Sequence, residues 1–332
     1  MSKIVCFGEA LIDMLAAPQA EPQAPRAFLQ FAGGAPANVA VAAARLGADS
    51  HFAGMLGQDM FGDFLHDSFV EAGVSTDCIV RTDAAKTALA FVALDARGER
   101  SFSFYRPPAA DLLFREADFA ETCFTGTGAF HVCSNSLTEP AIAAATLAGM
   151  RRAAAAGAVV SMDLNLRPAL WPAGVDPLPT LWEALQLADL VKLSREELAY
   201  LAAPLGADGE VAVRERLFAH RARLLVITDG GAPLRWHTAR EHSEQAGFAV
   251  TVRDTTAAGD AFVAGLLVHI GALGGHGAGF SAFLADRAAV EAAVAYGAAV
   301  GALAVTRHGA FAAMPTANEV THLLRNPHAL AS

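Results

Sequence analysis

Short apolar runs alternate with Ala-rich helical patterns along most of the chain. The apolar runs are KIVCFG, GAFHVC, AVVSMDL, LVKLS and RLLVITD, and each has the length of a strand buried on both faces. Between them lie patterns with helical spacing, such as PANVAVAAARLG, EPAIAAATLAGMRRAAAAG and SREELAYLAAPLG. This alternation predicts a three-layer α/β/α fold with a mainly parallel sheet. Because ligands of such folds bind beyond the carboxyl ends of the strands, we expect the functional residues there.

Two early regions depart from this alternation. Residues 11–32 hold the Pro- and Gln-rich stretch AAPQAEPQAP between two short apolar segments, and residues 87–105 read TALAFVALDARGERSFSFY. The second region alternates apolar and polar residues around a turn at Ala96–Gly98, which is typical of a β-hairpin. We therefore predict a small β-lid, formed from about residues 11–32 and 76–106 and inserted in a single domain over residues 1–332.

The composition is that of a globular protein with a large core. The chain has 332 residues, of which 54% are hydrophobic and 17% charged, and a formal net charge of −10. That charge argues against nucleic acid or an anionic membrane surface as the main partner. The start, MSKIVCFGEALIDM, resembles a strand rather than a secretion signal, and charged residues or Gly interrupt the apolar tracts. We therefore expect a soluble, cytoplasmic protein.

Cysteine and histidine show no metal-binding spacing. Cys6, Cys78, Cys123 and Cys133 form no C-x-x-C pair and stand mostly in apolar contexts. We interpret them as reduced thiols of the core. No H-x-x-x-H pattern occurs, so no histidine is assigned to a metal.

The stretch DTTAAGDAF, residues 254–262, stands directly before an apolar helical run. Its small residues Ala257, Ala258 and Gly259 would let backbone N–H groups at a helix start approach an anion closely. Asp260 would stand beside that anion, where a carboxylate can accept a proton from an attacking hydroxyl group. Helix capping would explain one acidic residue but not the run of small residues. The chain has no G-x-x-x-x-G-K-[ST] loop and no early G-x-G-x-x-G, which argues against a P-loop enzyme and a dinucleotide-binding oxidoreductase.

A second stretch, FAGGAPANVAVAAARLG, combines glycines with a polar residue at a helix start. Gly33 and Gly34 permit tight backbone conformations, Pro36 suits an early helical position, and Asn38 offers an amide. Such a helix start could bind sugar hydroxyl groups. An ordinary Gly turn with Asn near the helix start remains an equal alternative.

Together, these two stretches resemble the two signatures of the PfkB carbohydrate kinase family, also called the ribokinase family. Further landmarks follow in the family's order: GEALIDM, FSFYRPPAAD, DLNLRPALW, KLSREEL, VITDGG and ALAVTRHGA. The resemblance covers nearly the whole chain. It implies a ribokinase-like fold and an ATP-dependent transfer of phosphate to a sugar hydroxyl group.

The resemblance also implies roles for single residues around the reacting groups. Asp260 matches the catalytic base, and Ala257, Ala258 and Gly259 match the anion hole, although relatives more often carry Gly at position 257. The positions that match the sugar site are Asp13, Gly33, Gly34, Asn38, Arg106 and Arg167. For Arg167 a structural ion pair with Asp163 remains an equal alternative.

On the nucleotide side, Ser194 and Glu197 of KLSREEL resemble an N-x-x-E motif, in which the acid would act on Mg²⁺ through water. The same S-x-x-E spacing is also that of a helix capping box. Further matches to the nucleotide site are Thr228, Gly230, Gly231 and Ala298. Asp254, Thr256 and the carbonyl groups of residues 307–309 resemble a monovalent-cation site. The implied cofactors are thus ATP, Mg²⁺ and K⁺.

The resemblance of two motifs to those of one group within the family indicates the sugar substrate. GGAPANVAVAAARLG and FSFYRPPAAD look like those of bacterial fructokinases, which implies transfer of the γ-phosphoryl group to the 6-hydroxyl of D-fructose. A 2-keto-3-deoxygluconate kinase, in which Tyr105, Arg106 and Arg167 would hold a carboxylate, or another sugar kinase of the family are the alternatives. A non-catalytic sugar-binding regulator should have lost Asp260 or Gly259, and both are present. The family also implies a homodimer formed through the lid.

Overall fold

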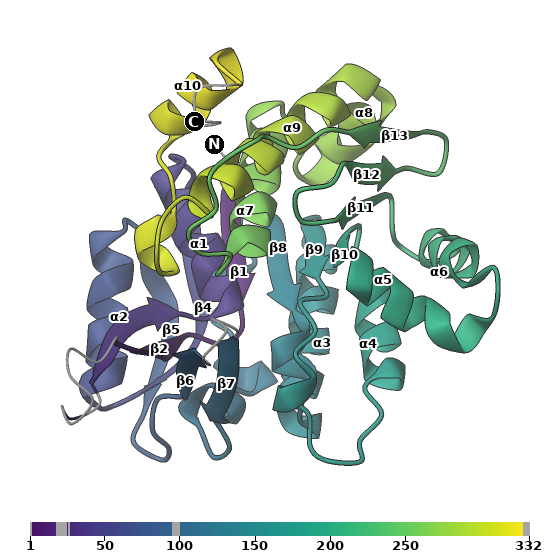
Figure 1. Ribbon diagram of the computed structural model, residues 1–332. Coiled ribbons are helices and arrows are strands. Elements are labelled where there is room, and N and C mark those ends of the chain that lie inside the picture. Colours follow the sequence, from purple (N-terminus) through teal and green to yellow (C-terminus); the bar gives the residue numbers. More distant parts are fainter. Residues whose placement is uncertain (1, 18–24, 26, 95–99, 328–332) are drawn as a thin grey trace.

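A computed structural model describes residues 2–17, 25, 27–94 and 100–327. The described residues form a nine-stranded sheet in the order β13-β12-β11-β10-β9-β8-β1-β4-β5 (Figure 1). Its strands are β1 (Lys3–Phe7), β4 (Ser50–Gly57), β5 (Ser75–Thr82), β8 (Thr127–Cys133), β9 (Val159–Asp163), β10 (Leu190–Ser194), β11 (Leu224–Thr228), β12 (Leu234–His237) and β13 (His242–Gln245). The neighbouring strands β11, β10, β9, β8, β1, β4 and β5 pair in parallel. At the other edge, β12 pairs antiparallel with β11, and β13 pairs antiparallel with β12. The five apolar runs are β1, β8, β9, β10 and β11, so the prediction of a mainly parallel sheet is confirmed.

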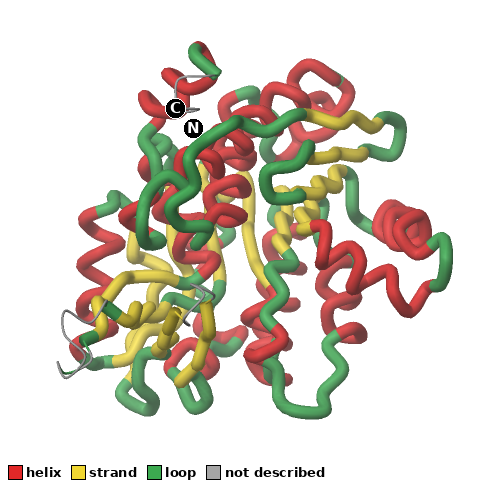
Figure 2. The backbone as a smooth tube through the Cα atoms, in the orientation of Figure 1, coloured by secondary structure: helices red, strands yellow, loops and turns green. Residues whose placement is uncertain are grey.

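Helices cover both faces of this sheet, which gives the predicted three layers (Figure 2). They are α1 (Ala35–Arg45), α2 (Met60–Glu71), α3 (Pro140–Ala155), α4 (Leu178–Leu185), α5 (Arg195–Ala202), α6 (Gly209–Phe218), α7 (Ala258–Ala272), α8 (Phe280–Ala285), α9 (Arg287–Ala304) and α10 (Ala317–Arg325). A separate hydrophobic core lies on each face of the sheet, as strand β1 shows. Its side chains alternate between faces, so Ile4 and Cys6 pack with α1, α7 and α9, whereas Val5 and Phe7 pack with α3 to α6.

Helix α9 is 18 residues long with a mean hydropathy of 1.2, which would suit a membrane span by length and composition alone. As predicted, a charged residue and glycines interrupt its apolar residues, at Glu291, Gly297 and Gly301. Half of this helix is buried inside the protein. It packs closely on α7, because a Cβ atom at Gly265 would lie 2.6 Å from Val300. These contacts are typical of a core helix.

Four further strands form a second sheet in the order β3-β2-β6-β7. They are β2 (Leu11–Ala16), β3 (Phe28–Gly33), β6 (Leu89–Leu94) and β7 (Arg100–Tyr105). Strands β6 and β7 pair antiparallel, as a hairpin should. Its expected turn at Ala96–Gly98, like most of AAPQAEPQAP, lies outside the described residues. We call this second sheet the lid.

The proposed boundary of the lid needs one correction. Residues 76–82 belong to β5, which pairs with β4 at the edge of the main sheet rather than with a lid strand. The physical reason is packing, since Cys78 and Val80 contact one core of the main domain and Ile79 contacts the other. The second lid segment therefore begins near β6.

Candidate active site

The first turn of α7 carries the residues of DTTAAGDAF at the carboxyl edge of the main sheet. Ala257, the residue before the helix, adopts a left-handed conformation with φ 59° and ψ 14°. The alanine side chain has no polar group that could cap this helix start. Because the first N–H groups of a helix have no partner within it, this turn leaves donors available to an anion.

A buried ion pair stands against this turn. Lys192 of β10 and Asp163 at the end of β9 lie 3.1 Å apart, and both side chains are buried. A Cβ atom on Gly259 would lie 2.9 Å from Lys192 Nζ, so glycine lets the ammonium group lie close to this turn without a shift. Burial lowers the pKa of Lys192, but the combined attraction of Asp163, Glu197 and Asp260 outweighs burial and raises the pKa above its usual value. A fixed positive charge therefore stands beside the open helix start.

Asp260 lies in the same turn and is 6% exposed. Asn38 Nδ2 donates to one carboxylate oxygen at 2.8 Å, and Asn165 Nδ2 donates to the other at 3.1 Å. Burial raises the pKa of Asp260 to about 7, while the hydrogen bond from Asn38 opposes that rise and Asp163 adds to it. A carboxylate with a fixed orientation and a pKa near neutrality can serve as a general base.

The residues expected at the sugar site come together where the lid meets the main domain. Asp13 of β2 faces Gly33 of β3, where a Cβ atom would lie 2.2 Å from the Asp13 carboxylate. Asp13 also lines a cavity of about 40 Å³ with Phe31, Asp254 and Thr256. The lid thus carries its carboxylate toward the loop that precedes α7.

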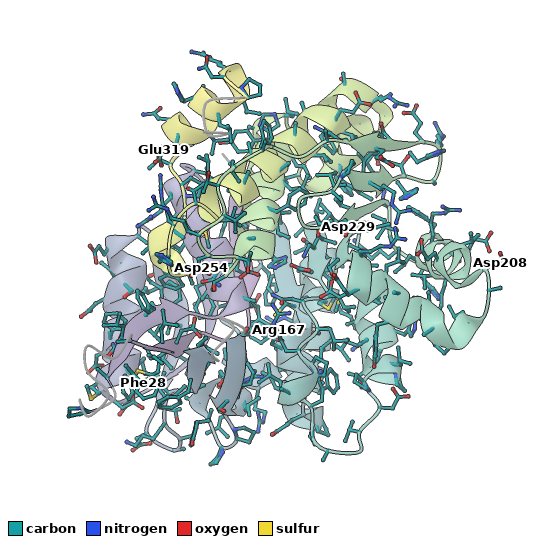
Figure 3. All side chains as sticks on the ribbon, in the orientation of Figure 1. Phe28, Arg167, Asp208, Asp229, Asp254 and Glu319 are labelled. Carbon is teal, nitrogen blue, oxygen red and sulfur yellow. The ribbon has the colours of Figure 1, made fainter. Side chains whose placement is uncertain are left out.

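The two arginines expected at the sugar site differ in burial and in their partners. Arg106 is 2% exposed, and its Nε and Nη2 atoms donate to Asp111 at 2.8 and 2.6 Å. Its Nη1 atom has no hydrogen-bond partner among the described residues. Arg167 is exposed, and its charge lowers the pKa of Asp260 (Figure 3). Asp163 pairs with Lys192 rather than with Arg167, so the ion-pair alternative for Arg167 is wrong.

Asp254 joins the two loops of the expected cation site. One carboxylate oxygen accepts the backbone N–H of Thr256 at 2.7 Å, and the other accepts that of Gly309 at 3.1 Å. In the described part of the chain, no group of three or more His, Cys, Asp or Glu residues could hold a metal ion. Any cation here would depend on carbonyl and hydroxyl oxygens as well.

The start of α5 forms a complete capping box. Ser194 accepts the N–H of Glu197 at 3.2 Å, and Glu197 accepts the N–H of Ser194 at 2.7 Å. The second oxygen of Glu197 accepts the N–H of Leu166 at 2.8 Å. Burial and the neighbouring Asp163 raise the pKa of Glu197. The capping alternative for S-x-x-E is confirmed, and action on Mg²⁺ stays a prediction.

The expected nucleotide residues extend along the same edge of the sheet. Thr228 ends β11 beside Ser194 of β10, and the two are paired in the ladder. Gly230, with φ 55°, and Gly231 follow in an exposed loop where a Cβ atom would meet nothing within 4 Å. Ala298 lies on α9, partly buried against the core. The loops after β9, β10 and β11 therefore share one open edge.

Comparison with known proteins agrees with this geometry. The model of the pfkB family carbohydrate kinases matches residues 1–317. The chain belongs to this family. It is 39% identical to fructokinase-2 of Solanum habrochaites, over 97% of this chain and 96% of that protein. A fructokinase from Xylella fastidiosa, solved with bound ATP, has 58% identity and a TM-score of 0.93, with 97% of this chain and 98% of that chain covered.

A more distant structure was solved with a sugar and a cation. A double mutant of the Vibrio cholerae O395 fructokinase, in its fructose, ADP and potassium ion bound form, has 31% identity and a TM-score of 0.84, with 98% of each chain covered. Membership of the pfkB family makes the protein a carbohydrate kinase, a phosphotransferase with a ribokinase-like fold, as the sequence predicted.

Sequence reasoning missed part of this kinase's site. Lys192 gave a signal, since a lysine inside the apolar run LVKLS is unusual for a buried strand. Asn165 lies within the landmark DLNLRPALW, but its bond to Asp260 joins residues 95 positions apart and leaves no local pattern. Its φ of 40° is also a conformation that Asn adopts more readily than most residues.

Proposed function

We propose that this kinase transfers the γ-phosphoryl group of ATP to the 6-hydroxyl of D-fructose. The observation that carries the proposal is the buried Asp260 carboxylate, held by two amides beside the open start of α7. The fructokinase relatives support fructose as the acceptor. The resemblance of the motifs to bacterial fructokinases supports the same choice.

In this mechanism Asp260 accepts the proton of the attacking sugar hydroxyl. The amides of Asn38 and Asn165 orient the carboxylate toward that hydroxyl. The N–H groups of residues 257–259 and the ammonium group of Lys192 stabilise charge on the transferring phosphoryl group. Asp13 would orient the sugar from the lid, and closure of the lid would exclude water that competes as acceptor.

The cations implied by the family fit the donor atoms present. Mg²⁺ bound with ATP would neutralise charge on its phosphates. Glu197 would contact that ion through water, because each of its oxygens keeps one lone pair beyond the N–H group it accepts. Asp254, Thr256 and the carbonyl groups of residues 307–309 offer the oxygen ligands that a K⁺ ion requires. We propose ATP, Mg²⁺ and K⁺ for this chain on these grounds.

One observation favours a second acceptor. The unpartnered Nη1 of Arg106 and the exposed guanidinium of Arg167 could together hold a carboxylate. That arrangement would suit 2-keto-3-deoxygluconate.

The test is an ADP-release assay with ATP, Mg²⁺ and K⁺ on fructose, ribose, 2-keto-3-deoxygluconate, glucose and adenosine. We expect kcat/KM for fructose to exceed that for every other acceptor by roughly tenfold or more. Preference for the keto-acid would favour the second acceptor and place specificity on the two arginines. Turnover of no acceptor, with fructose binding by calorimetry, would instead favour a non-catalytic sugar-binding protein. The matched control is Asp260→Asn, which should release no ADP above background.

We also propose a homodimer formed through the lid. Phe28, Leu29 and Tyr105 are 42%, 50% and 67% exposed on lid strands. Phe91 joins this surface, with ring contacts to Phe28 at 5.1 Å and to Tyr105 at 5.2 Å. Exposed aromatic patches are typical of interfaces. Light scattering after gel filtration should give twice the chain mass, and Leu29→Asp should reduce it; a monomeric native protein would contradict the proposal.

We place the kinase in the cytoplasm. All four cysteines are free and buried, which suits a reducing compartment. Fractionation of cells that produce the protein would test this placement.

A further inference from the structure

Glu9 is a buried carboxylate that joins three segments around the sugar side of the site. It is the second residue after β1 and is 1% exposed. Its Oε1 atom accepts the backbone N–H of Ala35 at 3.0 Å and the Nδ2 amide of Asn135 at 2.9 Å. Its Oε2 atom accepts the thiol of Cys133 at 3.7 Å. Each of these contacts joins Glu9 to a segment that is distant in the sequence.

The first of these contacts fixes the start of α1. Gly34, which precedes the helix, has no side chain to cap it, so Glu9 supplies the acceptor from a distant segment. The backbones also meet closely, because a Cβ atom on Gly34 would lie 2.5 Å from the Glu9 carbonyl oxygen. One helical turn later, Asn38 donates to the carboxylate of Asp260. Glu9 therefore fixes the first turn of α1 and, through it, the position of Asn38, which holds Asp260.

The other side of Glu9 faces the base of the lid. Arg106 follows β7 directly, and its charge acts on Glu9 within the protein interior. Burial raises the pKa of Glu9, and the charge of Arg106 opposes that rise. Arg106 is held from its other side by Asp111. Glu9 is thus hydrogen-bonded to the start of the helix that carries Asn38, and the charge at the root of a lid strand acts on it.

We propose that Glu9 is a positioning residue for phosphoryl transfer, which holds the start of α1 in register with Asp260. Glu9 acts through Ala35 and Asn38 and does not touch the reacting atoms. Because it orders the sugar side, its loss affects the sugar more than ATP. The proposal rests on the proposed function.

The test compares Glu9→Ala and Glu9→Gln with the native enzyme in the same assay. For Glu9→Ala we expect the fructose KM to rise by roughly tenfold or more, while the ATP KM stays within about twofold. Glutamine keeps an acceptor for Ala35 and Asn135, so Glu9→Gln should recover the fructose KM to within about threefold of native. Partial unfolding would reduce kcat through the active fraction and leave both KM values unchanged.

Asp189 offers a matched control at the opposite edge of the sheet. It is also a buried carboxylate that accepts a backbone N–H, that of Val160 at 2.9 Å. Asp189→Asn should lower stability without changing the fructose KM. The proposal is overturned if Glu9→Ala leaves the fructose KM unchanged, raises both KM values equally, or matches Asp189→Asn in every readout. Failure of the proposed function is distinct, since the native enzyme itself would then not phosphorylate fructose.

Discussion

Helices α5 and α7 begin at the same edge of the sheet, yet their first turns are completed in opposite ways. At α5, Ser194 and Glu197 satisfy each other's backbone N–H groups. At α7, the residue before the helix is an alanine in a left-handed conformation, and its side chain has no polar group that could cap the turn. One helix start is closed by its own residues, and the other remains open.

The difference separates a stabilising helix start from a functional one. Both carboxylate oxygens of Glu197 accept backbone N–H groups, one from Leu166 and one from Ser194, and these hydrogen bonds fix the side chain. Asp260 is held instead by amides from α1 and from the loop after β9, so its position depends on elements far apart in the sequence. In the proposed mechanism, the left-handed alanine and the buried acid at α7 serve to provide backbone donors and a base with a pKa near neutrality.

Replacement of the base should give the largest effect. Asp260→Asn keeps the shape of the side chain but cannot accept the proton, so we expect kcat to fall by roughly 10²–10⁴-fold. Fructose affinity, measured by calorimetry, should stay within about threefold of native. Glu197→Gln is the comparison variant, and an equal loss of kcat there would show that the two carboxylates do not differ as described.

The pH dependence should reveal the same acid. With the pKa of Asp260 at about 7 in the free enzyme, kcat/KM for fructose should rise about tenfold per pH unit below 7 and level off above it. In the unfolded chain this carboxyl titrates near pH 4. Between about pH 4 and 7 the folded protein keeps a proton that the unfolded chain has lost, so the stability contributed by this group falls as pH rises and is lost above 7.

Asp260→Asn removes that dependence. Its unfolding temperature should therefore exceed that of the native protein at pH 8, by an amount that shrinks toward pH 5. Thermal unfolding at both pH values measures this. A raised pKa of Asp260 would be contradicted if the unfolding temperature of the native protein, relative to that of Asp260→Asn, increased from pH 5 to pH 8.

The closed helix start should respond in stability rather than in rate. Ser194→Ala removes one half of the capping box, so we expect a loss of about 1 kcal/mol in the free energy of unfolding. The value of kcat should remain within about threefold of native. Denaturant titration and the ADP-release assay measure the two quantities, and a large rise in the Mg²⁺ requirement would instead support a role in metal binding.

The smallest effect should come from relief of strain at the open helix start. Ala257→Gly frees a left-handed residue from the Cβ contact that costs L-residues roughly 1–2 kcal/mol, and the added chain entropy of glycine offsets part of the gain. We expect the unfolding temperature to rise by about 1–3 °C with kcat unchanged. A decrease would mean that the methyl group makes contacts that outweigh the strain.

The sequence was most informative where the signal is local. Buried parallel strands such as β9 and β10 are mostly apolar, and the small residues before Asp260 mark an unusual helix start. The partners of Asp260 and the role of Glu9 were not readable, because these contacts join segments far apart in the chain. The boundary of the lid failed for a similar reason: β5 and β6 are both short strands, and only their partners assign them to different sheets.

The lid strands come from two separate parts of the chain, and this bears on the order in which the molecule folds. Ile12 of β2 pairs with Leu89 of β6, across β4, α2 and β5. Contacts between such distant segments form slowly, because a long loop must close first. During refolding, the nearby strands β9 and β10 should thus pair before β2 pairs with β6, which pulsed hydrogen exchange would detect as protection of β9 and β10 ahead of β2.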